Sequence, residues 1–276
     1  MIRESLREAL VRLAEIPALW ITGLYLGGLF ALYLLFLAWE NIILARILFL
    51  GLCALPFFLG GTYGAIRGDG TGLRGYVGAG AMYYFRILLA GAVIVGAALF
   101  TALLVMAPIL VVGGSLQEAI PSSLLGVGVS FAFLTAFTGT AIVFEDRRVL
   151  DSIRRSVEFV TGNLKASVLF YLSNLAIGLL ISFLSVALWS FTAADRVLPL
   201  VEGNQTAIEN LTASGLVELI GPAGLWAGVV IGFLAVAIGG ALLTAFGACF
   251  FRRVAASSPA AGPQGEFDEK GRWYRY

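Results

Sequence analysis

The apolar residues of this chain gather in long uninterrupted runs, with little alternation of apolar and polar positions inside them. A helix of about 20 apolar residues spans the hydrocarbon core of a bilayer, which is roughly 30 Å thick. Because barrel strands alternate apolar and polar residues, the pattern instead predicts transmembrane helices in an all-α, polytopic integral membrane protein. We expect six of them, at Pro17–Trp39, Ile42–Ile66, Ile87–Val112, Leu124–Phe144, Ala166–Ser190 and Pro222–Phe251.

Composition agrees with this prediction and narrows the chemistry. Of the 276 residues, 59% are hydrophobic and 13% are charged, whereas about a quarter of a soluble domain is charged. Histidine is absent, so the commonest general base and metal ligand is missing, and we expect no enzyme, cofactor or metal site. Cys53 and Cys249 both fall in predicted spans, where we expect them to pack as small apolar side chains.

The basic residues fall mainly in alternate gaps between the runs. Most of the 18 Lys and Arg residues lie on the same side as the N-terminal segment, and the opposite side keeps only Arg46 and Arg196. The positive-inside rule therefore predicts a multi-pass plasma-membrane protein with both termini in the cytoplasm. The last outer segment holds two N-x-T sequons, at Asn204 and Asn210, whose glycosylation depends on the host.

A short pattern recurs before the first, third and fifth runs: a small residue, an aliphatic residue, Arg, two variable residues and an aliphatic residue. It occurs at Ser5–Leu10, Gly72–Val77 and Ser152–Val157. It indicates either three units, each an amphipathic arm followed by a transmembrane hairpin, or a coincidence in an apolar sequence. We predict six helices arranged as three hairpins with cytoplasmic arms in residues 1–254. A cytoplasmic linker and tail would follow in residues 255–276.

The third arm carries the densest charge of the chain. Its apolar residues are three or four positions apart, which predicts a helix with one apolar face: Leu150, Ile153, Val157, Val160 and Leu164. Pairs of opposite charge lie four residues apart at Arg147–Asp151, Asp151–Arg155 and Arg154–Glu158. We favour a helix at the membrane surface over a specific anion site. In the alternative, a lipid headgroup or phosphorylated ligand would contact Arg147, Arg148, Arg154 and Arg155.

Polar and small residues form a stripe along one face of the fifth run, three or four positions apart. The stripe consists of Ser167, Tyr171, Asn174, Gly178, Ser182 and Ser185. Such a face usually makes hydrogen bonds to neighbouring helices. The alternative is one wall of a polar cavity for a small molecule or headgroup, and Asn174 is then its most important residue.

Glycines at every fourth position occur in two runs. The sixth run has Gly224, Gly228 and Gly232, and the second has Gly60 and Gly64. Such faces let helix backbones approach closely. They would serve packing inside the bundle, self-association, or contact with other membrane proteins, and the pattern does not distinguish these.

The turn Phe144–Arg147, followed by Ser152, Arg155-Ser156 and Gly162-Asn163, resembles a segment found in a group of prokaryotic six-span membrane proteins of unknown role. That group includes the membrane domains that precede some glycerophosphodiester phosphodiesterases. The resemblance implies a membrane domain of the same topology. No hydrolase segment accompanies it in this chain, so the enzymatic association gains no support.

Together these features favour a non-catalytic membrane protein, a scaffold, assembly factor or membrane-organising component whose partners are membrane lipids and other membrane proteins. The alternative is a transporter or channel for a small neutral or lipid-like substrate. We expect no nucleic-acid partner. A lipid-modifying enzyme is disfavoured, because general acid–base and metal chemistry need groups that the apolar runs lack.

Overall fold

The structure of the chain is a computed structural model, which describes residues 1–39, 41–68, 72–111, 116–203, 213–257, 265–267 and 273–275. The sequons at Asn204 and Asn210 lie outside these ranges. The helices are α1 (Ile2–Glu15), the 3₁₀ helix η1 (Pro17–Leu19), α2 (Trp20–Trp39), α3 (Ile42–Arg67), α4 (Leu73–Val111), α5 (Leu116–Thr135), α6 (Thr138–Phe144), α7 (Val149–Gly162), α8 (Leu164–Gly203) and α10 (Ala213–Ser257). Two short strands, β1 (Gly265–Phe267) and β2 (Trp273–Arg275), pair antiparallel in the C-terminal tail.

Among the described residues, six helical segments are long and apolar enough to cross a membrane, and each overlaps one of the six predicted runs. Most ends agree within a few residues, but the third segment begins at Leu73 and not at the predicted Ile87, because the second arm is continuous with it. They are Pro17–Trp39, Ile42–Arg67, Leu73–Pro108, Ser123–Phe144, Leu164–Thr192 and Ile220–Ala256. The prediction of a helical, multi-pass membrane protein is therefore supported by the number, length and composition of these helices.

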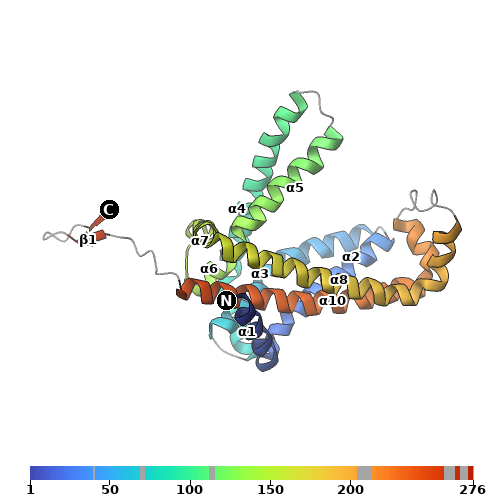
Figure 1. Cartoon of the computed structure of the whole chain (residues 1–276), viewed down its shortest axis with the longest axis horizontal. Coiled ribbons are helices and arrows are strands. Elements are labelled where there is room, and N and C mark those ends of the chain that lie inside the picture. The colour runs from blue at the N-terminus through green and yellow to red at the C-terminus, as the bar shows by residue number, and fades with distance from the viewer. Residues whose placement is uncertain are drawn as a thin grey trace.

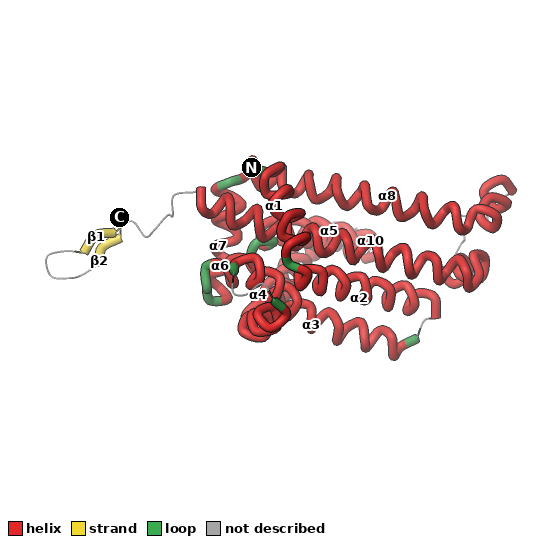
Figure 2. The backbone as a smooth tube through the Cα atoms, turned by 90° about the horizontal axis from the view of Figure 1, so that it is seen from below, coloured by secondary structure: helices red, strands yellow, loops and turns green. Residues whose placement is uncertain are grey.

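The spans form a row rather than a ring. In Figure 2 the order across the row is α8, α10, α2 and α3, and neighbouring helices in this order are in contact. Helix α4 packs beside α3, and α4 and α5 together stand away from the row (Figure 1). Consecutive spans contact each other in the pairs α2–α3, α4–α5 and α8–α10, but the most extensive contact joins the first span to the last, α2 to α10.

Glycines bring α2 and α10 close together. A Cβ atom on Gly23 would lie 2.1 Å from the carbonyl oxygen of Ala237, and one on Gly27 would lie 2.6 Å from that of Phe233. These two glycines of α2 are four residues apart, the spacing typical of closely packed membrane helices. The sequence analysis singled out this spacing in the second and sixth runs but overlooked it in the first.

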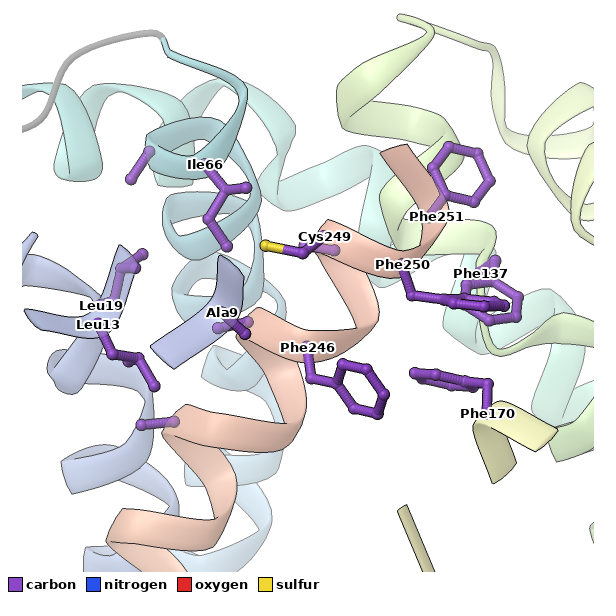
Figure 3. Packing of buried hydrophobic residues seen from close by; sticks show 14 of the residues in the cluster. Ala9, Leu13, Leu19, Ile66, Phe137, Phe170, Phe246, Cys249, Phe250 and Phe251 are labelled. Carbon is purple, nitrogen blue, oxygen red and sulfur yellow. The ribbon is translucent and has the colours of Figure 1, made fainter. Parts of the chain in front are cut away.

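The best-buried part of the bundle is a cluster of aromatic rings near the end of α10. Figure 3 shows Phe246 and Phe250 of α10 turned toward Phe137 and Phe170. The rings of Phe170 and Phe250 stack with their centroids 4.5 Å apart. Cys249 is fully buried in the same cluster, in agreement with its expected role as a small apolar side chain.

The three predicted arms differ from one another. The first and third are separate helices, α1 and α7, of 14 residues each. The second is not a separate helix, because Leu73–Val77 forms the first turns of the long helix α4. Gly72 precedes that helix directly, so no break separates the second arm from its span.

Candidate functional site

The polar stripe of α8 divides into two halves with different surroundings. Near the start of the helix, Tyr171 packs against the aromatic cluster and Ser167 is fully buried. Gly178, Ser182 and Ser185, farther along, line a groove. The stripe therefore faces neighbouring helices in its first half and a hollow in its second.

The groove lies between α8 and α10 and has a volume of about 460 Å³. This is within the range of small-molecule sites, roughly 300–1,000 Å³. Gly232, Gly239 and Gly240 of α10 contribute no side chains to it, and Phe30 of α2 adds to its lining. The remaining lining side chains are Ile181, Val186, Ala235, Val236 and Leu243. This lining therefore suits an apolar ligand.

Among the described residues, Ser182 and Ser185 contribute the only hydroxyl groups that line the groove. Ser185 donates a hydrogen bond to the carbonyl oxygen of Ile181 in its own helix, at 2.7 Å. Ser182 is exposed at the groove. Asn174 does not line the groove, and its amide donates to the Phe170 carbonyl at 2.8 Å. Asn174, the residue that the cavity alternative emphasised, is therefore bonded within its own helix.

The glycines predicted in the sixth run pack against side chains of this same chain. A Cβ atom on Gly228 would lie 3.2 Å from Nε1 of Trp189, and one on Gly232 would lie 2.5 Å from the ring of Phe30. Gly60 faces α4, where its Cβ would lie 3.4 Å from that of Tyr83. These contacts serve packing inside the bundle. Self-association or binding of other membrane proteins through Gly224, Gly228 and Gly232 stays a prediction.

The fourth span is broken where it meets α7 and α8. The helix stops at Thr135 and starts again at Thr138, so the amide of Phe137 does not bond back to Phe133. The Phe137 N–H donates instead to Ser156 Oγ at 3.1 Å, and Ser156 Oγ donates to the Leu134 carbonyl at 2.8 Å. The Tyr171 hydroxyl donates to the Phe133 carbonyl at 2.6 Å. Backbone groups in a membrane protein must find such partners, because lipid offers none.

A buried set of hydroxyl groups, which the sequence analysis overlooked, joins α2, α3 and α4. Thr22 Oγ1 lies 2.6 Å from Thr62 Oγ1 and 2.7 Å from the Tyr76 hydroxyl. The Phe58 carbonyl accepts from both Thr22, at 2.9 Å, and Tyr76, at 3.0 Å. These residues lie in three different spans, so no periodicity within one run reveals them.

Three of the four candidate headgroup arginines are paired with carboxylates. Arg154 donates to Glu158 at 2.8 Å, which confirms that predicted pair. Arg147 and Arg155 both donate to Glu145, Arg155 at 2.9 Å, so their predicted pairing with Asp151 is wrong. Glu145 follows α6 directly, and its position between the two arginines explains the difference. For the fourth, Arg148, no ion pair is found among the described residues.

The acid-rich turn after α6 connects several helices. Asp146 has a backbone φ of 48°, and its carboxylate accepts from Arg86 of α4 at 2.6 Å. The Val143 carbonyl accepts from Arg67 at the end of α3. Together with Arg155 of α7 bound to Glu145, these contacts hold the ends of α3 and α6 against α4 and α7. The charges that suggested an anion site therefore serve, in large part, to connect helices.

The buried face of α7 differs from the predicted apolar face. Ser152, Ser156, Phe159 and Val160 are buried, whereas Leu150 is 69% exposed. Small hydroxyl residues therefore face the bundle, and part of the apolar face points outward. Within the described residues, no group of three or more His, Cys, Asp or Glu side chains could hold a metal ion.

Comparison with known proteins identifies the family of this chain but not an activity. No curated protein and no solved structure matches the chain. The comparisons show no link to the membrane domains of glycerophosphodiester phosphodiesterases, so that resemblance stays a prediction. One family model matches residues 1–257, which include the six candidate spans of the described residues and the helices α1 and α7. The chain therefore belongs to the family described as a domain of unknown function, DUF7847.

Proposed function

We propose that this protein is a non-catalytic, membrane-organising component that holds an acyl chain of a membrane lipid in the groove between α8 and α10. The groove's lining of glycines and aliphatic side chains is the observation that carries the proposal. Lipid is as apolar as these side chains, so binding would come from close packing against the small residues of the lining, above all Gly178, where a Cβ would meet no atom within 4 Å, rather than from burial of apolar surface.

A single chain fits this hollow better than a partner helix does. Helices α8 and α10 are already in contact along the row. A helix with its side chains is about 10–12 Å in diameter. A helix would therefore rest across both neighbours, whereas an acyl chain can lie between them over Gly178. The hydroxyl groups of Ser182 and Ser185 line one wall.

We place the protein in the plasma membrane with both termini in the cytoplasm. The arrangement of the helix ends supports this proposal. Arg252 near the end of α10 donates to the Ile66 carbonyl and to Glu8 of α1, and Arg67 donates to the Val143 carbonyl. The ends of the second, fourth and sixth spans thus lie together with the N-terminal helix. We call this region, which carries Arg67, Arg155 and Arg252, the basic end, and the positive-inside rule would put it in the cytoplasm.

The proposal also retains a repeated unit of surface helix and hairpin. Helices α1 and α7 have the same length, and each position of α1 corresponds to the position 147 residues further on. Ser5, Ala9 and Leu13 are buried in α1, and the corresponding residues Ser152, Ser156 and Val160 are buried in α7. This equivalence supports duplication of the unit for the first and third arms. The middle unit would have lost its separate arm.

Photo-crosslinking in vesicles tests the groove. The purified protein is placed in phosphatidylcholine vesicles that contain a phosphatidylcholine with a diazirine on one acyl chain, and labelled peptides are identified by mass spectrometry. We expect labelling to concentrate on Gly178–Val186 and Gly232–Leu243. The change Gly178→Leu would place a side chain in the groove, and its Cβ would have no atom within 4 Å. It should reduce this labelling at least about fivefold, the equivalent of about 1 kcal/mol.

The matched control is Gly91→Leu in α4, an exposed glycine that is also helical and whose Cβ would also have no atom within 4 Å. It lies outside the groove and should leave the labelling of α8 and α10 unchanged. The proposal is wrong if wild-type protein is labelled no more at the groove than on the outward face of α8, for example at Phe183. It is equally wrong if the two leucine variants behave alike.

Transport of a small neutral or lipid-like substrate is the second candidate function. The break between Thr135 and Thr138 favours it, because interrupted helices line the substrate sites of many transporters. Translocation of a fluorescent phosphatidylcholine across proteoliposomes distinguishes the two functions. If the protein only holds lipid, the lipid should cross at the same rate as in protein-free vesicles. If the protein is a transporter, translocation should be faster, and Asn174→Ala should slow it without reducing the amount of folded protein.

A further inference from the structure

A second pocket lies at the corner between α7 and α8, beside the start of α1. Its volume is about 470 Å³, and its lining includes Ile2, Asn163, Leu164, Lys165 and Leu169. It is a different hollow from the α8–α10 groove, with which it shares no lining residue. It belongs to the basic end, because α8 begins there directly after α7.

The pocket combines an exposed lysine with an apolar wall. Lys165 is exposed, and no ion pair to it is found among the residues that the structure describes. Leu164 is 54% exposed and Leu169 is 46% exposed, so apolar surface continues from the lysine along α8 toward the membrane interior. A ligand that fits both features has an anionic group joined to apolar chains.

Lys165 is the side-chain cation that lines this pocket, and the amine of Met1, which also lines it, is already next to a carboxylate. The Met1 amine lies 3.5 Å from Glu4, and Arg253 donates to the same carboxylate at 2.8 Å. On α7, Arg154 is paired with Glu158, and Arg155 with Glu145. A basic side chain that is already paired offers less to an incoming anion, because the ligand must compete with a carboxylate.

We propose that this pocket binds the headgroup of an anionic phospholipid, with Lys165 contacting the phosphate and the acyl chains lying along Leu164 and Leu169. Lysine binds phosphate as a point charge. Leu164, Lys165 and Ala166, which line the pocket, also form the first turn of α8, whose backbone N–H groups favour an anion. Headgroup recognition thus lies at the start of α8 and not on the α7 arginines.

Lipid binding to the full-length protein tests the proposal. The protein in neutral detergent is titrated with phosphatidylglycerol or phosphatidylcholine, and bound lipid is counted by native mass spectrometry. We expect Lys165→Gln to weaken phosphatidylglycerol binding at least about fivefold and to leave phosphatidylcholine binding unchanged. A basic residue near an anionic surface contributes about 1 kcal/mol, which equals that factor. Lys165→Arg keeps the charge and should retain binding.

Arg148→Gln is the matched control, since it removes an exposed basic residue outside the pocket. It should lower phosphatidylglycerol binding less than about twofold. If Lys165→Gln and Arg148→Gln weaken phosphatidylglycerol binding equally, the attraction is general electrostatics and the proposal is wrong. It is also wrong if Lys165→Gln binds phosphatidylglycerol as well as the wild type does. Soluble glycerol phosphate that competes as well as the lipid would also overturn it, because the apolar wall would then contribute nothing. Gly178→Leu should leave phosphatidylglycerol binding unchanged. The proposal for the α8–α10 groove and the proposal for this pocket can therefore be rejected independently of each other.

Discussion

The hydroxyl of Ser156 replaces a helical hydrogen bond at Phe137. It accepts from the Phe137 amide at 3.1 Å and donates to the Leu134 carbonyl at 2.8 Å, so one side chain of α7 satisfies two backbone groups at the break between α5 and α6. Tyr171 satisfies a third, the Phe133 carbonyl. Helix α7 is therefore attached to the fourth span by hydrogen bonds as well as by packing of Phe159 on Phe137, whose ring centroids are 4.8 Å apart.

Removal of this hydroxyl should destabilise the protein. Ser156→Ala leaves a buried amide and a buried carbonyl without partners, which costs about 1–3 kcal/mol. The free energy of unfolding, measured by SDS titration in mixed micelles, should fall by that amount. Ser130→Ala is the control, because Ser130 is exposed on α5 and bonds only to the Gly126 carbonyl of its own helix. Equal stability of the two variants would show that the break does not depend on Ser156.

The contact of the first and last spans predicts a second effect. Gly23→Ala places a methyl group 2.1 Å from the Ala237 carbonyl oxygen, so α2 and α10 must move apart. Overpacking of this kind costs about 1–3 kcal/mol, and the SDS midpoint should fall accordingly. Gly28→Ala in the same helix is the control, since a Cβ at Gly28 meets nothing within 4 Å and should slightly stabilise the helix. A neutral Gly23→Ala would contradict the observed closeness of the two helices.

The buried hydroxyl cluster predicts a third effect. Tyr76→Phe removes the group that lies 2.7 Å from Thr22 Oγ1 and donates to the Phe58 carbonyl at 3.0 Å. We expect a loss of about 0.5–1.5 kcal/mol, because Thr22 still bonds Phe58 and Thr62. The same SDS titration measures it. Tyr33→Phe, at a tyrosine that is 42% exposed on α2, should have no effect. If both variants unfold at the same midpoint, the cluster contributes nothing to stability.

The spans could be predicted from the sequence, whereas the break in the fourth span could not. Runs of apolar residues depend only on local composition, and the predicted positions agree with the helices within a few residues at most ends. Ala136 and Phe137 are both common in membrane helices, and neither of them is a helix-breaking Pro or Gly. The helix breaks there because Ser156, 19 residues further on, supplies the missing partner. The spacing of residues within one apolar run cannot predict a contact with a residue outside that run.

The candidate site shows the same limit. The spacing from Ser167 to Ser185 predicted that these residues lie along one side of a helix, because a helix repeats every 3.6 residues, and all of them lie in α8. Which part of that side meets α10 and which part meets a hollow depends on the glycines of α10, far away in the chain. In the same way, the charges of α7 predicted Arg154 with Glu158 inside one helix but not Arg155 with Glu145 across a turn.

The attachment of α1 to the basic end predicts a fourth effect. Glu8 accepts from Arg252, and its other oxygen lies 3.3 Å from Arg253, so this carboxylate links α1 to the end of α10. Glu8→Gln removes the charge but keeps the shape. Since charge-assisted bonds are about twice as strong as neutral ones, we expect α1 to open more often. Its amide hydrogens should exchange about five- to tenfold faster, which corresponds to about 1–1.4 kcal/mol.

Hydrogen exchange followed by mass spectrometry of the Ile2–Glu15 peptide measures this effect, with the α7 peptide as an internal reference. Glu15→Gln is the control, because Glu15 is an exposed carboxylate at the end of the same helix. It removes the same charge from α1 without touching Arg252 and should leave the exchange unchanged. High salt should bring wild type closer to Glu8→Gln, since screening weakens a partly exposed ion pair. Faster exchange in both glutamine variants would mean that the overall charge of α1, and not its bond to α10, holds the helix in place.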